Sequence, residues 1–308
     1  MIEVQGLTKR YGTERAVDDI SFEVKSGEVL GFLGPNGAGK TTTMKVITCF
    51  LPPSEGTVRV NGYDVRTHAL EVRRQIGYLP EHTPLYLDMR VYAYLGFIAA
   101  MRGVASNQRD RRIADMAEVC GLGDVLQKPI EALSKGYRQR VGLAQAMIHD
   151  PEILILDEPT TGLDPNQIVE IRELIKAVGR EKTVILSTHI LPEVQASCDR
   201  VLIIHRGRLV ADGTPQDLKD SFSGGQRVRF GVTAGVAVLA TLSGRPDLQV
   251  IEHATDPGGE TVFTLSSDRP DDIRPDLFRL AVEHDWTLTE LHRDQANLED
   301  VFRQLTAA

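Results

Sequence analysis

The sequence has few cysteines and no long apolar run, and both features limit the classes of protein to which it can belong. Its three cysteines, Cys49, Cys120 and Cys198, lie far apart in 308 residues and show no metal-ligand spacing. An odd number of scattered cysteines favours a reducing cytoplasm over a secreted, disulfide-linked fold. The longest apolar stretch, Val91 to Met101, is much shorter than the roughly 18 residues that a membrane-spanning helix needs.

Basic residues are also in deficit, because the formal net charge is -8. Broad attraction to nucleic acid or to anionic lipid is therefore not expected. The first residues, Met1 to Val4, contain no basic segment followed by an apolar run, which predicts that there is no signal peptide. The composition is that of an ordinary soluble protein, so a function at a membrane would require another chain to cross it.

The apolar pattern predicts a strand-rich core that is interrupted by helices. A helix is expected from Lys40 to about Phe50, and a helical insertion at about 88–150. Seven short strands are expected at Ile2–Val4, Ile20–Val24, Val29–Leu33, Ile76–Leu79, Ile153–Leu156, Val184–Leu186 and Val201–Ile204.

A second, smaller domain is expected at 226–308, after a first domain at 1–220 and a linker at Ser221–Gly225. Its elements are predicted in the order strand, helix, strand, strand, helix, strand, helix. They are placed at Arg227–Val232, about 235–243, Leu248–His253, Thr261–Leu265, about 271–284, Thr287–His292 and Leu298–Leu305. That order predicts a ferredoxin-like α+β fold.

A glycine-rich segment after the expected strand Val29–Leu33 matches the phosphate-binding P-loop pattern. Its residues are Gly34, Pro35, Asn36, Gly37, Ala38, Gly39, Lys40 and Thr41, followed by Thr42 in the helix. Glycines allow successive backbone N–H groups to face the phosphates, and the helix adds its positive N-terminal end. Lys40 would contact the β- and γ-phosphates, and the Thr41 hydroxyl would be a Mg²⁺ ligand. The segment predicts a site for ATP and Mg²⁺.

Two carboxylates, Asp157 and Glu158, follow the buried strand Ile153–Leu156. In P-loop enzymes, an aspartate at this position holds Mg²⁺. Glu158 would orient and polarise the attacking water as a general base. Together with the P-loop, this pair predicts hydrolysis of the nucleotide.

The segment from Leu133 to Arg140, just before the acidic strand, resembles the signature motif of ABC ATPases, and the resemblance covers about residues 2–215. It implies an α/β P-loop NTPase fold, with a RecA-like core, an N-terminal antiparallel β subdomain and a helical insertion. It also implies a head-to-tail homodimer, in which each ATP lies between the P-loop of one subunit and the signature of the other. The residues implied to serve this site are Tyr11 at the adenine, Ser134 and Gly136 at the γ-phosphate, Asp164 in the loop joining the two sites, and His189 as the γ-phosphate sensor.

The sequence departs from the family pattern at two places. Glu81 lies where the family usually has a glutamine; a carboxylate can still contact Mg²⁺, but it cannot donate a hydrogen bond as an amide can. Lys135 and Tyr137 replace the usual glycine and glutamine of the signature. Ser134 and Gly136 are retained, so activity is expected to survive.

These features resemble a subgroup of bacterial exporters with one ATPase domain per chain, including multidrug, sodium and gliding-motility-associated systems. The resemblance implies a separate transmembrane permease as partner, no nucleic acid, and a cytoplasmic location on the inner face of the membrane. Tyr86, Tyr92, Tyr94 and Phe97 are either core residues of the helical insertion or part of the surface that receives a permease helix. The substrate is not encoded here, because the permease would line its path.

Two other functions are compatible with parts of the sequence. A soluble ABC protein acting on ribosomes or DNA would typically carry two cassettes or long coiled-coil arms, and neither is present. A regulatory module that binds ATP without hydrolysis would explain Glu81 and the altered signature. The presence of Glu158 and His189 argues against that reading.

Overall fold

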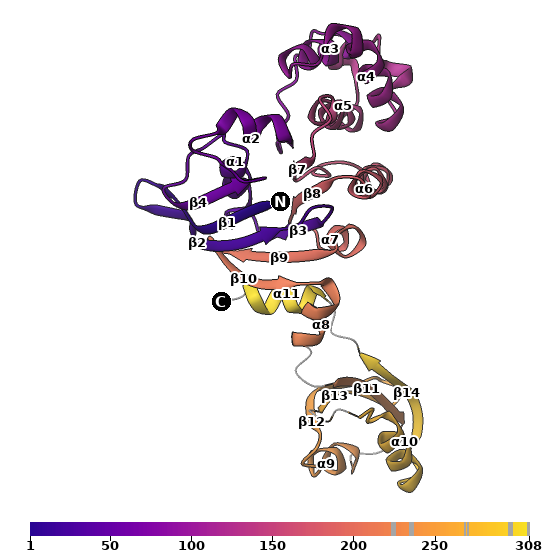
Figure 1. Cartoon of the computed structure of the whole chain (residues 1–308). Helices are drawn as coiled ribbons and strands as arrows, with labels where there is room; N and C mark the ends of the chain where they lie inside the picture. The colour runs from indigo at the N-terminus through magenta and orange to yellow at the C-terminus, as the bar shows by residue number, and fades with distance from the viewer. Residues whose placement is uncertain (223–225, 234–236, 268, 270, 295–297, 307–308) are drawn as a thin grey trace. The chain divides into compact units, whose positions relative to one another are not determined.

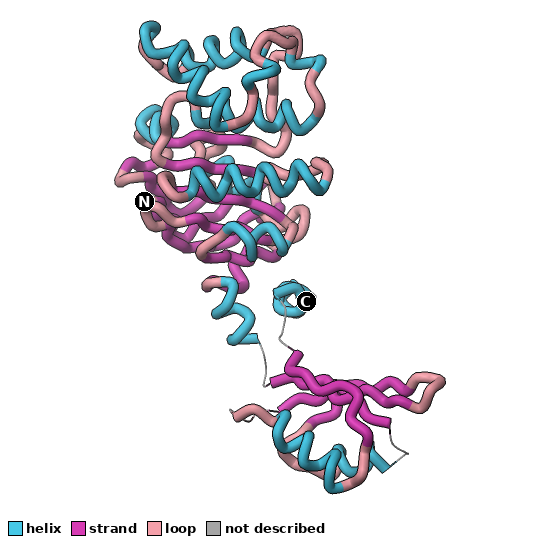
Figure 2. The backbone as a smooth tube through the Cα atoms, turned by 90° about the vertical axis from the view of Figure 1, so that its right-hand side faces the viewer, coloured by secondary structure: helices cyan, strands magenta, loops and turns pink. Residues whose placement is uncertain are grey.

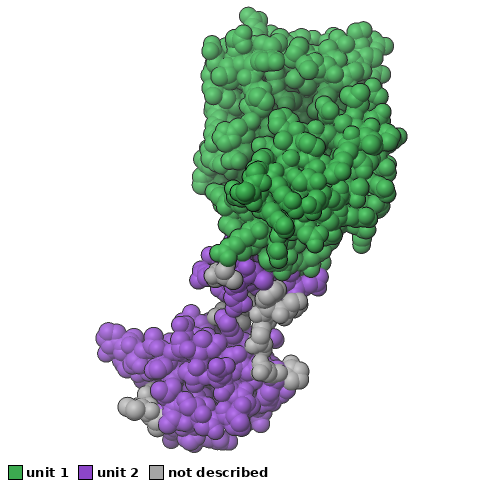
Figure 3. Space-filling view, turned by 90° about the vertical axis from the view of Figure 1, so that its left-hand side faces the viewer, with its two compact units in different colours: residues 1–215, 308 green, residues 216–307 purple. Residues whose placement is uncertain are grey.

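The computed structural model of the chain describes residues 1–222, 226–233, 237–267, 269, 271–294 and 298–306. They fall into two units, residues 1–215 and 216–307, which are coloured separately in Figure 3. The first unit holds the motif residues, and the second holds the small C-terminal fold.

A six-stranded sheet in the order β10, β9, β3, β8, β7, β6 organises the first unit, and every neighbouring pair except β10 with β9 is parallel. The strands are, in that order, Arg208–Gly213, Arg200–His205, Val29–Leu33, Thr183–Thr188, Ile153–Asp157 and Ile76–Leu79. The middle strands β3, β7 and β8 are buried along their whole length, as expected of a sheet covered on both faces. Because they are parallel, their carboxyl ends meet at one edge, where three of the predicted motifs begin.

A second sheet is antiparallel, in the order β2, β1, β4, β5. Its strands are Glu14–Val24, Ile2–Tyr11, Glu55–Val60 and Tyr63–Asp64. Helix α1 (Lys40–Ile47) shares one apolar core with both sheets, in which Ile2, Phe32 and Met44 are fully buried. The phosphate-binding segment is therefore anchored between two sheets.

The predicted helix from Lys40 to about Phe50 is too long, since α1 ends at Ile47. The hydroxyl of Thr48 donates to the carbonyl of Met44 at 2.9 Å, and Cys49 adopts a left-handed φ of 57°. That conformation does not continue a right-handed helix. Phe50 is consequently turned out and exposed.

The helical insertion contains α3 (Val91–Met101), α4 (Ser106–Val119) and α5 (Lys135–Met147), which gather at one end of the unit (Figures 1 and 2). Short 3₁₀ helices at Gly123–Val125 and Ile130–Ala132 connect α4 to α5. The remaining helices of this unit are α2 (Ala69–Gln75), α6 (Pro165–Gly179) and α7 (Leu191–Ser197). Among the described residues, no helix has both the length and the apolarity that a membrane span requires.

The second unit has the predicted ferredoxin-like order, strand, helix, strand, strand, helix, strand, with a final helix. Its sheet is antiparallel throughout, in the order β12, β13, β11, β14. The strands are Gln249–Thr255, Glu260–Ser267, Gln226–Thr233 and Thr287–Asp294, and the helices are α9 (Ala237–Ser243), α10 (Arg274–Glu283) and α11 (Leu298–Thr306). Helix α8 (Pro215–Phe222) includes Ser221 and Phe222, which the sequence placed in a linker; the other predicted linker residues, 223–225, lie outside the described residues.

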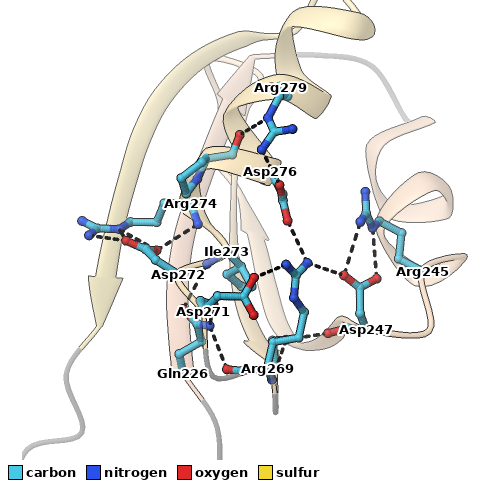
Figure 4. A network of polar contacts seen from close by, with 12 residues as sticks. Gln226, Arg245, Asp247, Arg269, Asp271, Asp272, Ile273, Arg274, Asp276 and Arg279 are labelled. Carbon is cyan, nitrogen blue, oxygen red and sulfur yellow. Dashed lines mark hydrogen bonds and ion pairs between the residues drawn. The ribbon is translucent and has the colours of Figure 1, made fainter.

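One arginine joins three segments of this second unit (Figure 4). The guanidinium of Arg269 forms ion pairs with Asp247, Asp271 and Asp276. Asp247 precedes β12, Asp271 lies in a loop, and Asp276 belongs to α10. The buried amide of Gln226 donates to the carbonyl of Arg269 at 3.1 Å, so the start of β11 is tied to the same cluster. Polar contacts thus supplement a core in which eleven apolar residues are buried, counted over the part of this unit that the structure describes.

Candidate functional site

The predicted phosphate-binding segment forms a tight turn between β3 and α1. Gly39 has a φ of 110°, and a Cβ placed on it would lie 2.5 Å from the carbonyl oxygen of Ala16. A Cβ on Gly34 would lie at the same distance from the carbonyl oxygen of Ile204. Only glycine fits at these two positions, because in both cases the obstacle is backbone rather than a movable side chain.

Lys40 lies at the centre of the turn, and its ammonium contacts three acceptors. It donates to the carbonyl oxygens of Gly34 and Pro35 at 2.8 and 3.2 Å. It also forms an ion pair with Glu158, with 3.1 Å between Nζ and Oε1, and both side chains are only 6% exposed. Lys40, predicted to contact the phosphates, and Glu158, predicted to orient the attacking water, are thus paired directly.

Asp157 ends β7 and faces the first turn of α1. Its Oδ1 accepts hydrogen bonds from the hydroxyls of Ser187 at 2.5 Å and Thr41 at 3.2 Å. Its Oδ2 is buried without a hydrogen-bond donor among the described residues. Burial raises the pKa of Asp157, and the nearby negative charges of Glu158 and Glu81 raise it further. A buried, unpaired carboxylate oxygen beside a threonine hydroxyl fits a divalent cation, which would offset the cost of burying the carboxylate charge.

Glu158 has a left-handed backbone, with a φ of 51°, which costs a residue with a Cβ about 1–2 kcal/mol. Its N–H donates to the carbonyl of Ser187 at 3.0 Å, which fixes the turn against β8. Its Oε2 accepts from Nδ1 of His189 at 2.8 Å and from the hydroxyl of Thr161 at 3.3 Å. Because an ionised carboxylate can only accept, Nδ1 carries the proton and Nε2 is left free to face a ligand.

Two further predicted residues, Glu81 and Tyr11, form no hydrogen bond or ion pair with this cluster among the described residues. Glu81 is exposed and lines a cavity of about 430 Å³ together with Thr41 and Asp157. Tyr11, at the end of β1, is half-exposed, and the ammonium of Lys9 lies 5.6 Å from its ring centre. One face of an exposed ring is the surface that a base needs for stacking.

The signature residues form a second group with the residues around Asp164. Ser134 is the N-cap of α5 and accepts from the N–H of Tyr137 at 3.4 Å, while Asp164 caps α6 and accepts from the N–H of Gln167 at 2.9 Å. A Cβ on Gly136 would lie 2.6 Å from the side chain of Gln167, so α5 and α6 begin side by side.

No hydrogen bond or ion pair among the described residues joins this second group to the P-loop. Figure 1 accordingly shows α5 and α1 in different parts of the unit. The structure therefore assembles Lys40, Thr41, Asp157, Glu158 and His189, and leaves Ser134, Gly136 and Asp164 apart from them.

Four residues in or next to the site were not assigned to it by the sequence. Ser187 and Thr161 bond the two carboxylates, and Thr188 and Glu193 lie behind the histidine. Ser187 and Thr188 directly precede the predicted sensor His189 and could have been found from that position. Glu193 carries no such signal, because a glutamate in the first turn of a helix is ordinarily exposed.

Comparison with known proteins gives consistent matches. A family model described as ABC transporter matches residues 17–161. The linearmycin resistance ATP-binding protein LnrL of Bacillus subtilis is 32% identical, over 99% of this chain and 98% of that protein. The Nod factor export ATP-binding protein I of Ralstonia nicotianae is 35% identical, over 99% and 94%.

A solved structure gives the same result. The structure of cbiO1 from Clostridium perfringens, described as part of the ABC transporter complex cbiONQ, has a TM-score of 0.65 and 30% identity, covering 70% of this chain and 89% of that one. The predicted α/β P-loop fold, with its antiparallel β subdomain and helical insertion, is confirmed. Matches along nearly the whole chain show that this protein belongs to the ABC transporter family, as an ATP-binding subunit.

Proposed function

We propose that this chain powers export through a separate membrane permease, using the cluster around Lys40 and Glu158 as its hydrolytic site. The observation that supports the assignment is the continuous set of contacts from Lys40 to Glu158 to His189 at 3.1 and 2.8 Å. In this assignment Lys40 binds the phosphates, Glu158 orients and polarises the attacking water, and His189 contacts the γ-phosphate. The Gly34–Thr42 backbone and hydroxyls hold the rest of the phosphate chain.

Thr41 and Asp157 would hold Mg²⁺, and Glu81, which lines the same cavity, would add a carboxylate oxygen. The described residues contain no cluster of three His, Cys, Asp or Glu ligands. The ion would therefore take phosphate oxygens and water to complete its shell, as Mg²⁺ in nucleotide sites does. When bound, it neutralises charge on the phosphates.

A second copy of the chain is proposed to complete the site. Ser134 and Asp164 are exposed and lie with the buried Gly136 in a group of their own, and the N-terminal end of α5 suits an anionic phosphate. A symmetric pair would bring this group of one subunit to the P-loop of the other, so that two ATPs are held between them. Tyr11 would stack on the adenine.

The permease is proposed to dock beside Glu81. The cavity that reaches Thr41 and Asp157 opens past Phe50, which is 71% exposed. A neighbouring cavity of about 520 Å³ is lined by Leu70 and Met101, which are 64% and 69% exposed. The groove combines these apolar side chains with Arg73, Arg74 and Arg102, a lining that suits a short amphipathic helix.

The aromatic residues of this region divide between the two predicted roles. Tyr94 is buried and bonds Gln145, as a core residue does. Tyr86 and Phe97 remain exposed near it, with 5.6 Å between their ring centres, and are available for contact with a partner.

Export is supported by the relatives, whose names concern linearmycin resistance and Nod factor export. A position on the cytoplasmic face of the membrane would follow from docking to a permease. Residues 1–220 are proposed as the ATPase domain and 226–308 as an accessory domain.

The first test is steady-state ATP hydrolysis by the purified chain and by Glu158→Gln. Loss of the general base is expected to lower kcat by about 10²–10⁴-fold while ATP still binds. Glu173→Gln, which removes an exposed carboxylate from α6, is the matched control and should match the wild type. Near-normal turnover in Glu158→Gln would remove this residue from its role.

The second test is capture of the partner from detergent-solubilised membranes by the tagged chain. A stoichiometric protein with several predicted membrane spans is expected. Met101→Asp should lose it while hydrolysing ATP normally, and Val282→Asp, an equally exposed apolar position in the second unit, should retain it. Recovery of ribosomes or nucleic acid instead would contradict the transport role.

A further inference from the structure

A buried glutamate behind the site contacts neither substrate nor solvent. Glu193 lies in the first turn of α7 and is 3% exposed. Its Oε1 accepts from the hydroxyl of Thr160, and its Oε2 accepts from the hydroxyl of Thr188 at 2.8 Å. Among the described residues it forms no ion pair, so two neutral hydroxyls are its partners. A buried carboxylate without a cation is costly, and its presence calls for a reason.

Each threonine that Glu193 holds lies within two residues of a member of the hydrolytic pair. Thr160 lies two residues after Glu158, whose left-handed φ of 51° must be maintained by its surroundings. Thr188 immediately precedes His189, and its carbonyl accepts from the N–H of Gly34 at 3.3 Å. One side chain therefore joins the turn after β7, the end of β8 and the start of the P-loop.

From these contacts we infer that Glu193 is a positioning residue for ATP hydrolysis. By fixing Thr160 and Thr188, it holds the Glu158 carboxylate and the His189 ring at the 2.8 Å separation observed between them. This inference rests on the proposed roles of Glu158 and His189. Residues that orient catalytic groups act on the rate of the chemical step more than on binding, because the phosphates are held chiefly by the P-loop.

The chemistry of the contact selects the variants. Glu193→Leu keeps most of the volume and removes both acceptors. Thr160→Val and Thr188→Val are nearly isosteric and each remove one of the two hydrogen bonds. Glu193→Gln is the conservative variant, since a threonine hydroxyl can accept from an amide as well as donate. Gln195→Leu, at an exposed position of the same helix, is the matched control.

The experiment measures kcat and KM for ATP, with kcat expressed per nucleotide-binding site titrated in the same preparation. Glu193→Leu is expected to lower kcat by about 10–100-fold and to change KM by less than about threefold. Each valine variant should show a smaller decrease in kcat, and adding Thr160→Val to Glu193→Leu should lower kcat little further. Glu193→Gln and Gln195→Leu should stay near the wild type.

Two results would overturn the inference. One is a kcat per binding site that stays near the wild-type value in Glu193→Leu, which would mean that the residue only stabilises the fold. If Glu193→Leu does not fold, unchanged rates in both valine variants lead to the same conclusion. Glu158→Gln, measured in parallel, separates the two proposals: if that variant remains active, the proposed roles fail, whereas if it is inactive and Glu193→Leu is normal, only this inference fails.

Discussion

The ion pair between Lys40 and Glu158 has a consequence for nucleotide affinity. Lys40 is expected to hold the β-phosphate, yet its ammonium is paired with a carboxylate whose charge has the same sign as that phosphate. An incoming nucleotide therefore competes with Glu158 for the same ammonium. Glu158→Gln removes the charge and preserves the shape of the side chain, so it should bind ADP more tightly than the wild type.

The size of the effect follows from the geometry of the pair. Two unit charges 3.1 Å apart attract by roughly 5 kcal/mol at an effective dielectric constant of about 20. Desolvation of two side chains that are only 6% exposed offsets much of this attraction. Lys40 keeps its carbonyl acceptors Gly34 and Pro35 in either state. We expect about 1.4 kcal/mol of the attraction to remain, which corresponds to a tenfold lower Kd for ADP in Glu158→Gln.

Calorimetric titration with ADP in the absence of Mg²⁺ is the suitable assay. ADP excludes both hydrolysis and closure driven by a γ-phosphate, so the measured Kd reflects the binding site of one subunit. Glu173→Gln again serves as the control, because it removes an equal charge at an exposed position. An ADP affinity in Glu158→Gln that equals or falls below that of the wild type would refute the competition.

Two further predictions concern other parts of the chain. Gly39→Ala should abolish measurable ATP binding in a titration, because the new Cβ would lie 2.5 Å from the carbonyl oxygen of Ala16 at a φ of 110°; unchanged affinity would show that the loop tolerates a side chain. The second unit should lose stability in acid, because Arg274 lowers the pKa of Asp272 to about 2. A carboxylate whose pKa is lower in the folded than in the unfolded chain stabilises the fold at pH values above its unfolded pKa, which is near 4. This contribution disappears as the pH falls toward 2. The fluorescence of Trp286, the only tryptophan of the chain, reports the unfolding of this unit alone. Arg274→Ala should make the stability of the unit less dependent on pH.

Much of the fold could be predicted because its strands have clear apolar patterns. The buried strands β3, β7 and β8 are continuous apolar runs, and the order of elements in the second unit was sufficient to predict its topology. The end of α1 was not predictable in the same way. The residues after Ile47 have acceptable helical propensity, and the helix ends because Cys49 takes a left-handed conformation that the local sequence does not specify.

The candidate site divides along similar lines. Lys40, Asp157, Glu158 and His189 were predicted because each belongs to a motif at the end of a strand. They converge because β3, β8 and β7 are neighbours in one parallel sheet. Glu193 could not be predicted, since its role depends on burial against two threonines that are 5 and 33 residues away in the sequence. Functional groups that carry the chemistry have sequence patterns, whereas groups that position them are defined by tertiary contacts.

The segment from Glu158 to Asp164 connects the two groups of site residues within one chain. It begins at the proposed general base, is held in its middle by Glu193 through Thr160, and ends at the cap of α6. Its Gly162 packs so closely on Lys135 of the signature that a Cβ there would lie 1.9 Å from Nζ. In the proposed dimer, a nucleotide held by the second subunit would lie at the start of α5, next to this same segment. Binding at one site of a dimer would thereby act on the Glu158 turn of the other, and Glu193 would set how rigidly that turn responds.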